Sequence, residues 1–251
     1  SKTCRKEESS MGVIIFNEIP STNYGIHVEK PPVYAIPERD YEVVHIPGRN
    51  GDLVIDNGSY QNVARKYDIS VGEIDGNFTN LAAGVSEWLH SASGYARLED
   101  SYEPDYFRLA YYVADAEMEN LFHQAGKMSI EFNCKPARFL KVGERAVSFT
   151  TAGSLRNPTF QKSFPKLIVT LSGSGTLTVG DQIITISGLT DSTRMVIDSE
   201  LQDVYAEGSM TNLNSKVSFS DGFPLLIPGV NSIAFTGSIT SVEVIPRWWI
   251  L

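Results

Sequence analysis

Alternation of apolar and polar residues marks strands along much of the chain. In 63–71 every second residue (Val63, Arg65, Tyr67, Ile69 and Val71) falls on one face, and three of the four residues between them are charged or polar. Successive side chains of a strand point to opposite faces, so this pattern predicts a strand with one buried side. The first half shows further strand patterns at 13–16, 41–46, 53–55, 106–114 and 128–134.

One helix is expected in the first half. Apolar residues recur there at spacings of three and four, which places them on one face of a helix. They are Phe78, Leu81, Val85, Trp88 and Leu89. Thr79 is suited to cap the start of this helix, and Gly94 follows its end.

The composition changes after residues 136–144, which we interpret as a linker. Ser, Thr, Gly and β-branched residues then dominate, and no helix is expected. Short strands are predicted at 166–171, 176–179, 182–186, 194–198, 216–219, 232–235 and 238–245. Their spacing, with Gly173-Ser174-Gly175 interpreted as a hairpin turn, is typical of an antiparallel sandwich.

The patterns together predict a mainly β chain of the β-rich α+β class. We expect an N-terminal domain at 11–138 with one helix, and a C-terminal antiparallel β-sandwich at 139–251. The polar residues 1–10 have no periodicity and are interpreted as an expression-derived or disordered leader. Residues 47–52 form a tight turn in this scheme, because Asn50-Gly51 tolerates the positive φ of a hairpin turn.

Charge narrows the classes of function. The chain has 30 acidic and 21 basic residues, a net charge of −9. Residues 1–140 hold 21 of the acids and 13 of the bases, and so carry −8 of that charge. A general nucleic-acid binder or a protein of anionic membrane surfaces would present a basic face. With no membrane span and no signal peptide in the pattern, we expect synthesis in a cytoplasm.

The sequence lacks the motifs of an enzyme. Gly173-Ser174-Gly175 does not fit a nucleophile elbow, and no phosphate-binding or dinucleotide-binding loop is found. His27, His45, His90 and His123 do not have metal-ligand spacing, and Cys134 is interpreted as a small buried hydrophobe. We therefore expect no catalytic residues, no metal and no cofactor.

An acidic cluster and a set of aromatic residues remain as candidates for a functional surface. The acidic residues are Glu99, Asp100, Glu103, Asp105, Asp115, Glu117 and Glu119. They lack the calcium-loop spacing, and a solvated acidic face is expected. In the second half, aromatic side chains suited to stacking on a sugar, or to packing in a core or interface, are Tyr205, Phe219, Phe223, Trp248 and Trp249.

Four short motifs carry a family resemblance. They are HIPGRNGDL at 45–53, VIDSE at 196–200, FPLLIPGVNSI at 223–233 and PRWWIL at 246–251. In order and spacing these motifs resemble those of the siphophage distal tail protein family over residues 11–251. Trp249 stands where the family usually has arginine.

The resemblance implies a structural hub of a long non-contractile phage or prophage tail. Family members form a hexameric ring, sometimes stacked as a dodecamer, at the distal end of the virion tail. Their N-terminal domain builds the ring around a channel for DNA, and their C-terminal domain is a galectin-like sandwich. The implied partners are the tail-tube protein, the tape-measure protein and a tail-tip, baseplate or receptor-binding protein.

Two groups of residues follow as candidates. We expect subunit contacts at the hairpin tip, which comprises Gly48, Arg49, Asn50, Gly51 and Asp52. Arg49 could pair with a carboxylate of the next subunit or cap its own turn. Members of the acidic cluster are expected to face the channel, where like charge repels DNA phosphate. The alternative function is a carbohydrate-binding adhesion module acting through Tyr205, Phe223, Trp248 or Trp249.

Overall fold

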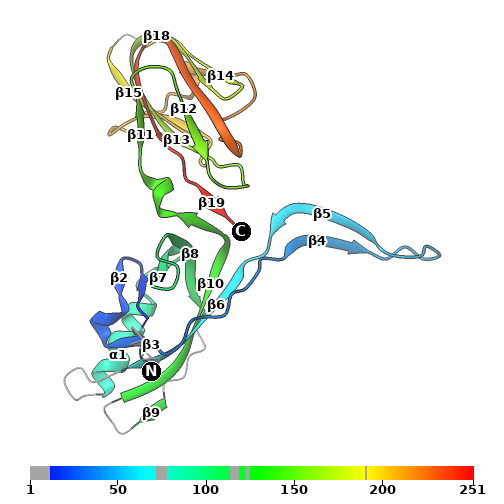
Figure 1. Ribbon diagram of the computed structural model, residues 1–251, viewed down its shortest axis with the longest axis vertical. Helices are drawn as coiled ribbons and strands as arrows, with labels where there is room; N and C mark the ends of the chain where they lie inside the picture. Colours follow the sequence, from blue (N-terminus) through cyan, green and yellow to red (C-terminus); the bar gives the residue numbers. More distant parts are fainter. Residues whose placement is uncertain (1–11, 72–77, 114–118, 122–124, 190) are drawn as a thin grey trace, which may run out of the picture. The chain divides into compact units, whose positions relative to one another are not determined.

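The computed structural model describes residues 12–71, 78–113, 119–121, 125–189 and 191–251. The chain divides into two compact units, residues 1–138 with Leu251, and residues 139–250 (Figure 1). Antiparallel strands dominate both units, so the predicted β-rich class is confirmed. We call residues 1–138 with Leu251 unit 1, and residues 139–250 unit 2.

Unit 1 is built on one large sheet. Its main strand order is β2-β1-β7-β8-β10-β6-β3, and β9 pairs with β10. The bounds are β1 Ile14–Phe16, β2 Ile19–Pro20, β3 Ile26–Val28, β6 Val63–Val71, β7 Ala96–Asp100, β8 Tyr106–Val113, β9 Glu119–Leu121 and β10 Ala125–Leu140, with a 3-10 turn η1 at Ser21–Tyr24. A separate two-stranded sheet consists of β4 Arg39–Val44 and β5 Leu53–Tyr60.

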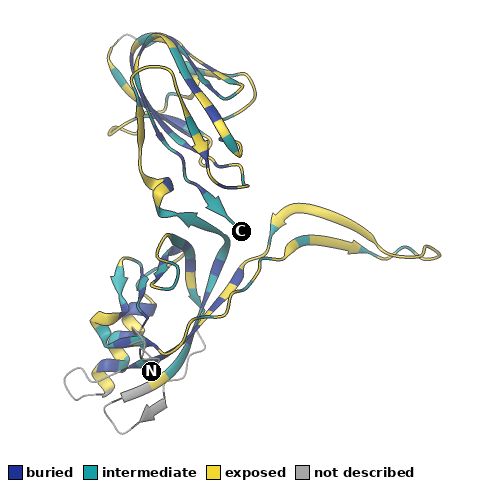
Figure 2. Ribbon diagram, in the orientation of Figure 1, coloured by how far each residue is buried: buried dark blue, intermediate teal, exposed yellow. Residues whose placement is uncertain are grey.

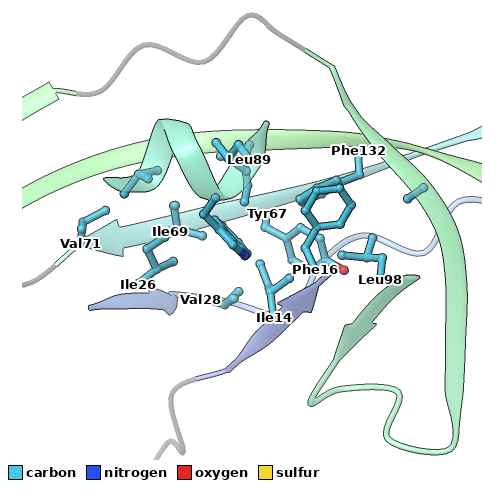
Figure 3. Packing of buried hydrophobic residues seen from close by; sticks show 14 of the residues in the cluster. Ile14, Phe16, Ile26, Val28, Tyr67, Ile69, Val71, Leu89, Leu98 and Phe132 are labelled. Atoms are coloured by element: carbon cyan, nitrogen blue, oxygen red, sulfur yellow. The ribbon is translucent and has the colours of Figure 1, made fainter. Parts of the chain in front are cut away.

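The core of unit 1 lies between this sheet and the α-helix α1 (Phe78–Leu89). Trp88 is fully buried and donates its indole N–H to the Ile19 carbonyl at 3.1 Å. Phe16 and Phe132 pack with ring centroids 4.9 Å apart, and Figure 3 shows them beside Tyr67 and Leu98. The predicted apolar face of the helix is confirmed by the burial of Leu81, Val85, Trp88 and Leu89. Thr79 lies within the helix, after Phe78, rather than at its cap.

Unit 2 is a curled antiparallel sheet around its own core. The main strand order is β11-β18-β13-β14-β17, with β12 on β18, β15 on β13 and β16 on β15. The bounds are β11 Val147–Phe149, β12 Gly153–Asn157, β13 Lys166–Val179, β14 Gln182–Ile186, β15 Thr193–Asp198, β16 Asp203–Ala206, β17 Val217–Phe219, β18 Gly229–Ile245 and β19 Trp249–Ile250, with 3-10 turns η2 Lys141–Glu144 and η3 Asn214–Lys216. Within this unit, the Leu140 N–H donates to the Trp248 carbonyl at 2.8 Å.

The predicted hairpin turn at Gly173-Ser174-Gly175 is wrong. β13 runs through these residues with a change of register, and the two strands predicted at 232–235 and 238–245 are joined in β18. Gly175 lies opposite Gly237, whose φ is 74°. A Cβ on Gly237 would lie 2.6 Å from the Ser174 carbonyl oxygen, so the glycines allow two paired strands to bend closely past each other.

The predicted linker at 136–144 contains the division between the two units, which falls between Arg138 and Phe139. It has regular structure throughout, because β10 continues to Leu140 and is followed directly by η2.

Candidate assembly surface

The β4–β5 hairpin carries an unusual number of exposed apolar side chains. Val43 pairs with Val54 across the two strands, and their exposed fractions are 61% and 55%. Tyr41, Leu53 and Ile55 are exposed as well, and Figure 2 shows exposed residues along nearly the whole hairpin. An isolated two-stranded sheet is marginally stable, and contiguous exposed apolar residues mark interaction sites. The hairpin is therefore the best candidate for contact with another chain.

The base of the hairpin is held by polar contacts. Arg39 pairs with Asp56 and lies over the Tyr60 ring, 5.1 Å from its centroid. Asp40 accepts hydrogen bonds from Asn57 and Ser59, each at 3.2 Å. These contacts join β4 to β5 beside the exposed apolar residues and fix their register.

The tip of the hairpin contains the predicted interface residues 48–52. It is a wider loop than the predicted tight turn, because the last strand pair is Val44 with Leu53. Positive φ falls on Gly48 (82°) and Gly51 (81°) and not on Asn50. His45 Nδ1 lies 3.0 Å from Asp52 Oδ1, which closes the loop.

Arg49 is exposed at this tip. Its backbone N–H donates to the Ile46 carbonyl at 3.2 Å. Among the described residues, none forms a hydrogen bond or ion pair with its guanidinium. The side chain is thus available to a partner, and its proposed pairing with a neighbouring subunit stays a prediction.

The structure draws two members of the acidic cluster into a buried ionic network in unit 1. Asp100 accepts from Arg65 Nη2 at 2.8 Å and from the Tyr67 hydroxyl at 2.7 Å. Glu103 lies 3.0 Å from Arg65, 3.3 Å from Arg108 and 2.8 Å from Arg138. Burial alone would lower the pKa of Arg65, but Tyr67 and Asp100 outweigh it and raise that pKa. Asp100 and Glu103 thus neutralise buried arginines.

The other acidic candidates have different surroundings. Glu99 is paired with Arg97, and Asp105 is exposed. Asp115 and Glu117 lie outside the described residues, and Glu119 belongs to β9 with its side chain not described. The described acidic residues are therefore close in sequence but do not form one surface. That members of the cluster face a channel stays a prediction.

The aromatic candidates of unit 2 are mostly packed inside it. Tyr205 and Trp248 have exposed fractions of 7% and 4%, so neither offers a ring face to a sugar. Phe219 and Phe223 pack with centroids 4.4 Å apart, and the Trp249 indole donates to the Lys162 carbonyl at 2.9 Å. The packing interpretation fits these contacts better than sugar stacking.

The described residues offer little chemistry of other kinds. Within them, no group of three or more His, Cys, Asp or Glu side chains is arranged to hold a metal ion. No helix in the described segments has both the length and the apolar character needed to cross a bilayer. Cys134 is fully buried, and burial raises the pKa of its thiol to about 12, so it is a packing residue.

Comparison with known proteins supports the fold. No protein-family model matches the sequence, and no curated protein is significantly similar to it. The fold is that of a phage distal tail protein. The crystal structure of SPP1 Dit (gp 19.1) superposes with a TM-score of 0.70 over 96% of this chain and 99% of its own, at 14% identity. SPP1 Dit is described as a paradigm of the hub adsorption apparatus of phages that infect Gram-positive bacteria.

Proposed function

We propose that this chain is a structural, non-enzymatic hub protein of a phage tail. The proposal rests on the fold shared with SPP1 Dit over nearly the whole length of both chains. Four sequence motifs, ending with residues 246–251, resemble the same family independently of the structure. In the proposed role the protein forms a hexameric ring, single or stacked, at the distal end of a long non-contractile tail.

The exposed apolar hairpin is the observation that supports assembly most directly. Each aliphatic side chain that moves from water into a subunit contact contributes about 1 kcal/mol or more. Val43 and Val54 lie on one face of the two paired strands, and Leu53 and Ile55 lie on the other. Because the hairpin is one local feature of an asymmetric chain, its contact with a different surface of the next copy would be heterologous and could close into a ring.

The ring would surround a channel for DNA in transit. Asp105 is the exposed, described member of the acidic cluster that fits a channel wall best, whereas Asp100 and Glu103 already serve buried arginines. A net charge of −8 on residues 1–140 would repel phosphate from such a wall. The tail-tube and tape-measure proteins would bind on one side of the ring, and the tail-tip or baseplate protein on the other.

Sedimentation velocity and negative-stain electron microscopy test the ring. The wild type should sediment as a hexamer or dodecamer at micromolar concentration and appear as rings. Val43→Asp/Val54→Asp should be monomeric with unchanged circular dichroism, because carboxylates would replace the apolar contact. Val230→Asp in unit 2 is the matched control, since Val230 is 64% exposed and outside the hairpin. A monomeric wild type would refute the proposal.

A further inference from the structure

Asparagine followed by glycine occurs twice in the chain, and both sites lie in the β4–β5 hairpin. Asn50-Gly51 belongs to the tip, and Asn57-Gly58 belongs to β5. This dipeptide is chemically labile, because glycine has no Cβ and its backbone nitrogen can approach the side-chain carbonyl carbon of the preceding asparagine. Attack of the nitrogen on that carbon starts a rearrangement, and the surroundings of the two groups decide its rate. The structure gives the two sites different surroundings.

At the tip, the described residues do not restrain the reacting groups. The Asn50 side chain is exposed, and among the described residues none forms a hydrogen bond with its amide or with the Gly51 N–H. A Cβ placed on Gly51 would have no neighbour within 4 Å, so the space around this peptide is open. Both the attacking nitrogen and the carbon that it attacks are therefore free to approach each other.

Asn57 is held by hydrogen bonds in the base of the hairpin. Its Nδ2 donates to Asp40 Oδ2 at 3.2 Å, which fixes the side-chain amide. The Gly58 N–H donates to Asp56 Oδ1 at 2.9 Å, so the nitrogen that would attack is already engaged. Asp56 is in turn paired with Arg39. A hydrogen bond to a charged acceptor that must break first slows the reaction by about tenfold or more.

We propose that Asn50 is a site of spontaneous covalent modification in the unassembled chain and that the fold protects Asn57. The Gly51 nitrogen loses its proton and bonds to Cγ of Asn50, which closes a five-membered succinimide ring. The bond from Cγ to Nδ2 breaks, and the amide nitrogen takes up a proton and leaves as ammonia. Water then opens the ring at either carbonyl, which leaves aspartate or isoaspartate.

The reaction changes the chemistry of the tip. Either product adds a carboxylate next to Arg49, whose guanidinium has no ion-pair partner among the described residues. Isoaspartate also inserts its side-chain methylene into the backbone of the loop that His45 and Asp52 close. The inference goes beyond the proposed ring and does not rest on it, because it concerns a single chain before the tip meets another one.

Peptide mass spectrometry tests the difference between the two sites. The wild-type chain is kept at neutral pH below the concentration at which mass photometry detects oligomers, and is then digested with pepsin in acid, where the reaction is slow. The mass gain from amide to carboxyl should appear at Asn50 at least about tenfold faster than at Asn57. Asn50→Gln is the control, since it should abolish the gain at the tip and leave the slow gain at Asn57 unchanged.

Unfolding and one substitution test the cause of the difference. In concentrated urea the two asparagines should convert at similar rates, because both precede glycine and neither is held. In the folded chain, Asp56→Ala should accelerate the conversion of Asn57 by about tenfold, since the Gly58 N–H loses its acceptor. Asp52→Ala removes a carboxylate from the tip instead and should leave the rate at Asn57 unchanged.

The outcomes separate this inference from the ring. Equal rates at Asn50 and Asn57 in the folded chain, or an Asn50 that converts in urea but not in the folded chain, would overturn it. A difference that persists in urea would also overturn it, because the neighbouring sequence and not the fold would then protect Asn57. A wild type that is monomeric at every concentration refutes the ring alone and leaves the comparison of the two asparagines unaffected.

Discussion

Arg247 holds the carboxylate of Asp198 with two parallel hydrogen bonds, from Nη1 to Oδ1 at 2.7 Å and from Nη2 to Oδ2 at 2.8 Å. The two residues belong to separate family-like motifs, at 196–200 and 246–251. The Asp198 side chain is 2% exposed, so this planar pair fixes the C-terminal segment of unit 2 against the end of β15.

Removal of Arg247 should destabilise the protein, because it leaves a buried carboxylate without its cation. We expect Arg247→Met to lower the free energy of unfolding by about 3 kcal/mol in urea titrations. Arg194→Met is the control, since Arg194 is 45% exposed and its pairs with Glu207 and Glu243 lie at the surface. That change should cost about 1 kcal/mol or less. Equal effects of the two variants would contradict the assigned role.

The same pair predicts a pH dependence. Burial by itself would raise the pKa of Asp198, but hydrogen bonds from Arg247 and from the N–H groups of Leu201 and Glu200 outweigh it and lower that pKa below its ordinary value of 3.8. A carboxyl with a lowered folded pKa stabilises the fold above its unfolded pKa, and this contribution is lost as the pH falls through the folded pKa. The stability difference between the wild type and Asp198→Asn should therefore be constant above about pH 5 and shrink below about pH 4. A difference that grows in acid would contradict this.

Two neighbours in the acidic cluster should respond differently to substitution. Asp100 is 8% exposed and bound by Arg65 and Tyr67, whereas Asp105 is exposed. Asp100→Asn should lower the free energy of unfolding by about 3 kcal/mol, since it breaks a buried pair. Asp105→Asn should change it by no more than about 0.5 kcal/mol. If urea unfolding shows similar losses of stability for the two variants, Asp100 does not stabilise the protein through its buried contacts with Arg65 and Tyr67.

Gly237 should tolerate no side chain. Its φ of 74° disfavours other residues, and a Cβ would lie 2.6 Å from the Ser174 carbonyl oxygen. Gly237→Ala should cost more than about 2 kcal/mol, measured by thermal and urea unfolding. Gly222→Ala separates the two causes: its φ is 66° with open space around the added Cβ, so only the backbone cost of about 1 kcal/mol applies. Similar losses for both variants would leave no role for the close strand contact.

Much of the fold could be predicted from local patterns. The strand at 63–71 and the strand at 182–186 match β6 and β14 to the residue, because alternation is a property of neighbouring side chains. The helix at 78–89 was equally visible from its spacing. The strand β7 (Ala96–Asp100) was missed because its buried side consists of Ala96, Leu98 and the charged Asp100. Asp100 is buried only because Arg65 and Tyr67 of another strand bind it.

The candidate site was predictable only in part. The predicted turn at 47–52 indicated where the hairpin lies. It did not predict the full length of β5 or the exposure of Val43 and Val54. Exposure depends on which residues find partners elsewhere in the chain, and periodicity does not report it. The resemblance of four motifs to distal tail proteins predicted the fold. The similarity of the structure to SPP1 Dit confirms that prediction of the fold.

The sequence by itself determined the β-rich class, the position of the helix, the presence of a turn within residues 47–52 and the concentration of the net negative charge in residues 1–140. Each of these depends on residues close together in the chain, or on simple counting. The tertiary structure decided that Asp100 and Glu103 neutralise buried arginines, that Gly175 and Gly237 bend paired strands, and that an apolar hairpin stays uncovered. The physical reason is that burial, charge pairing and strand register arise between segments far apart in sequence, where local pattern carries no information about the partner.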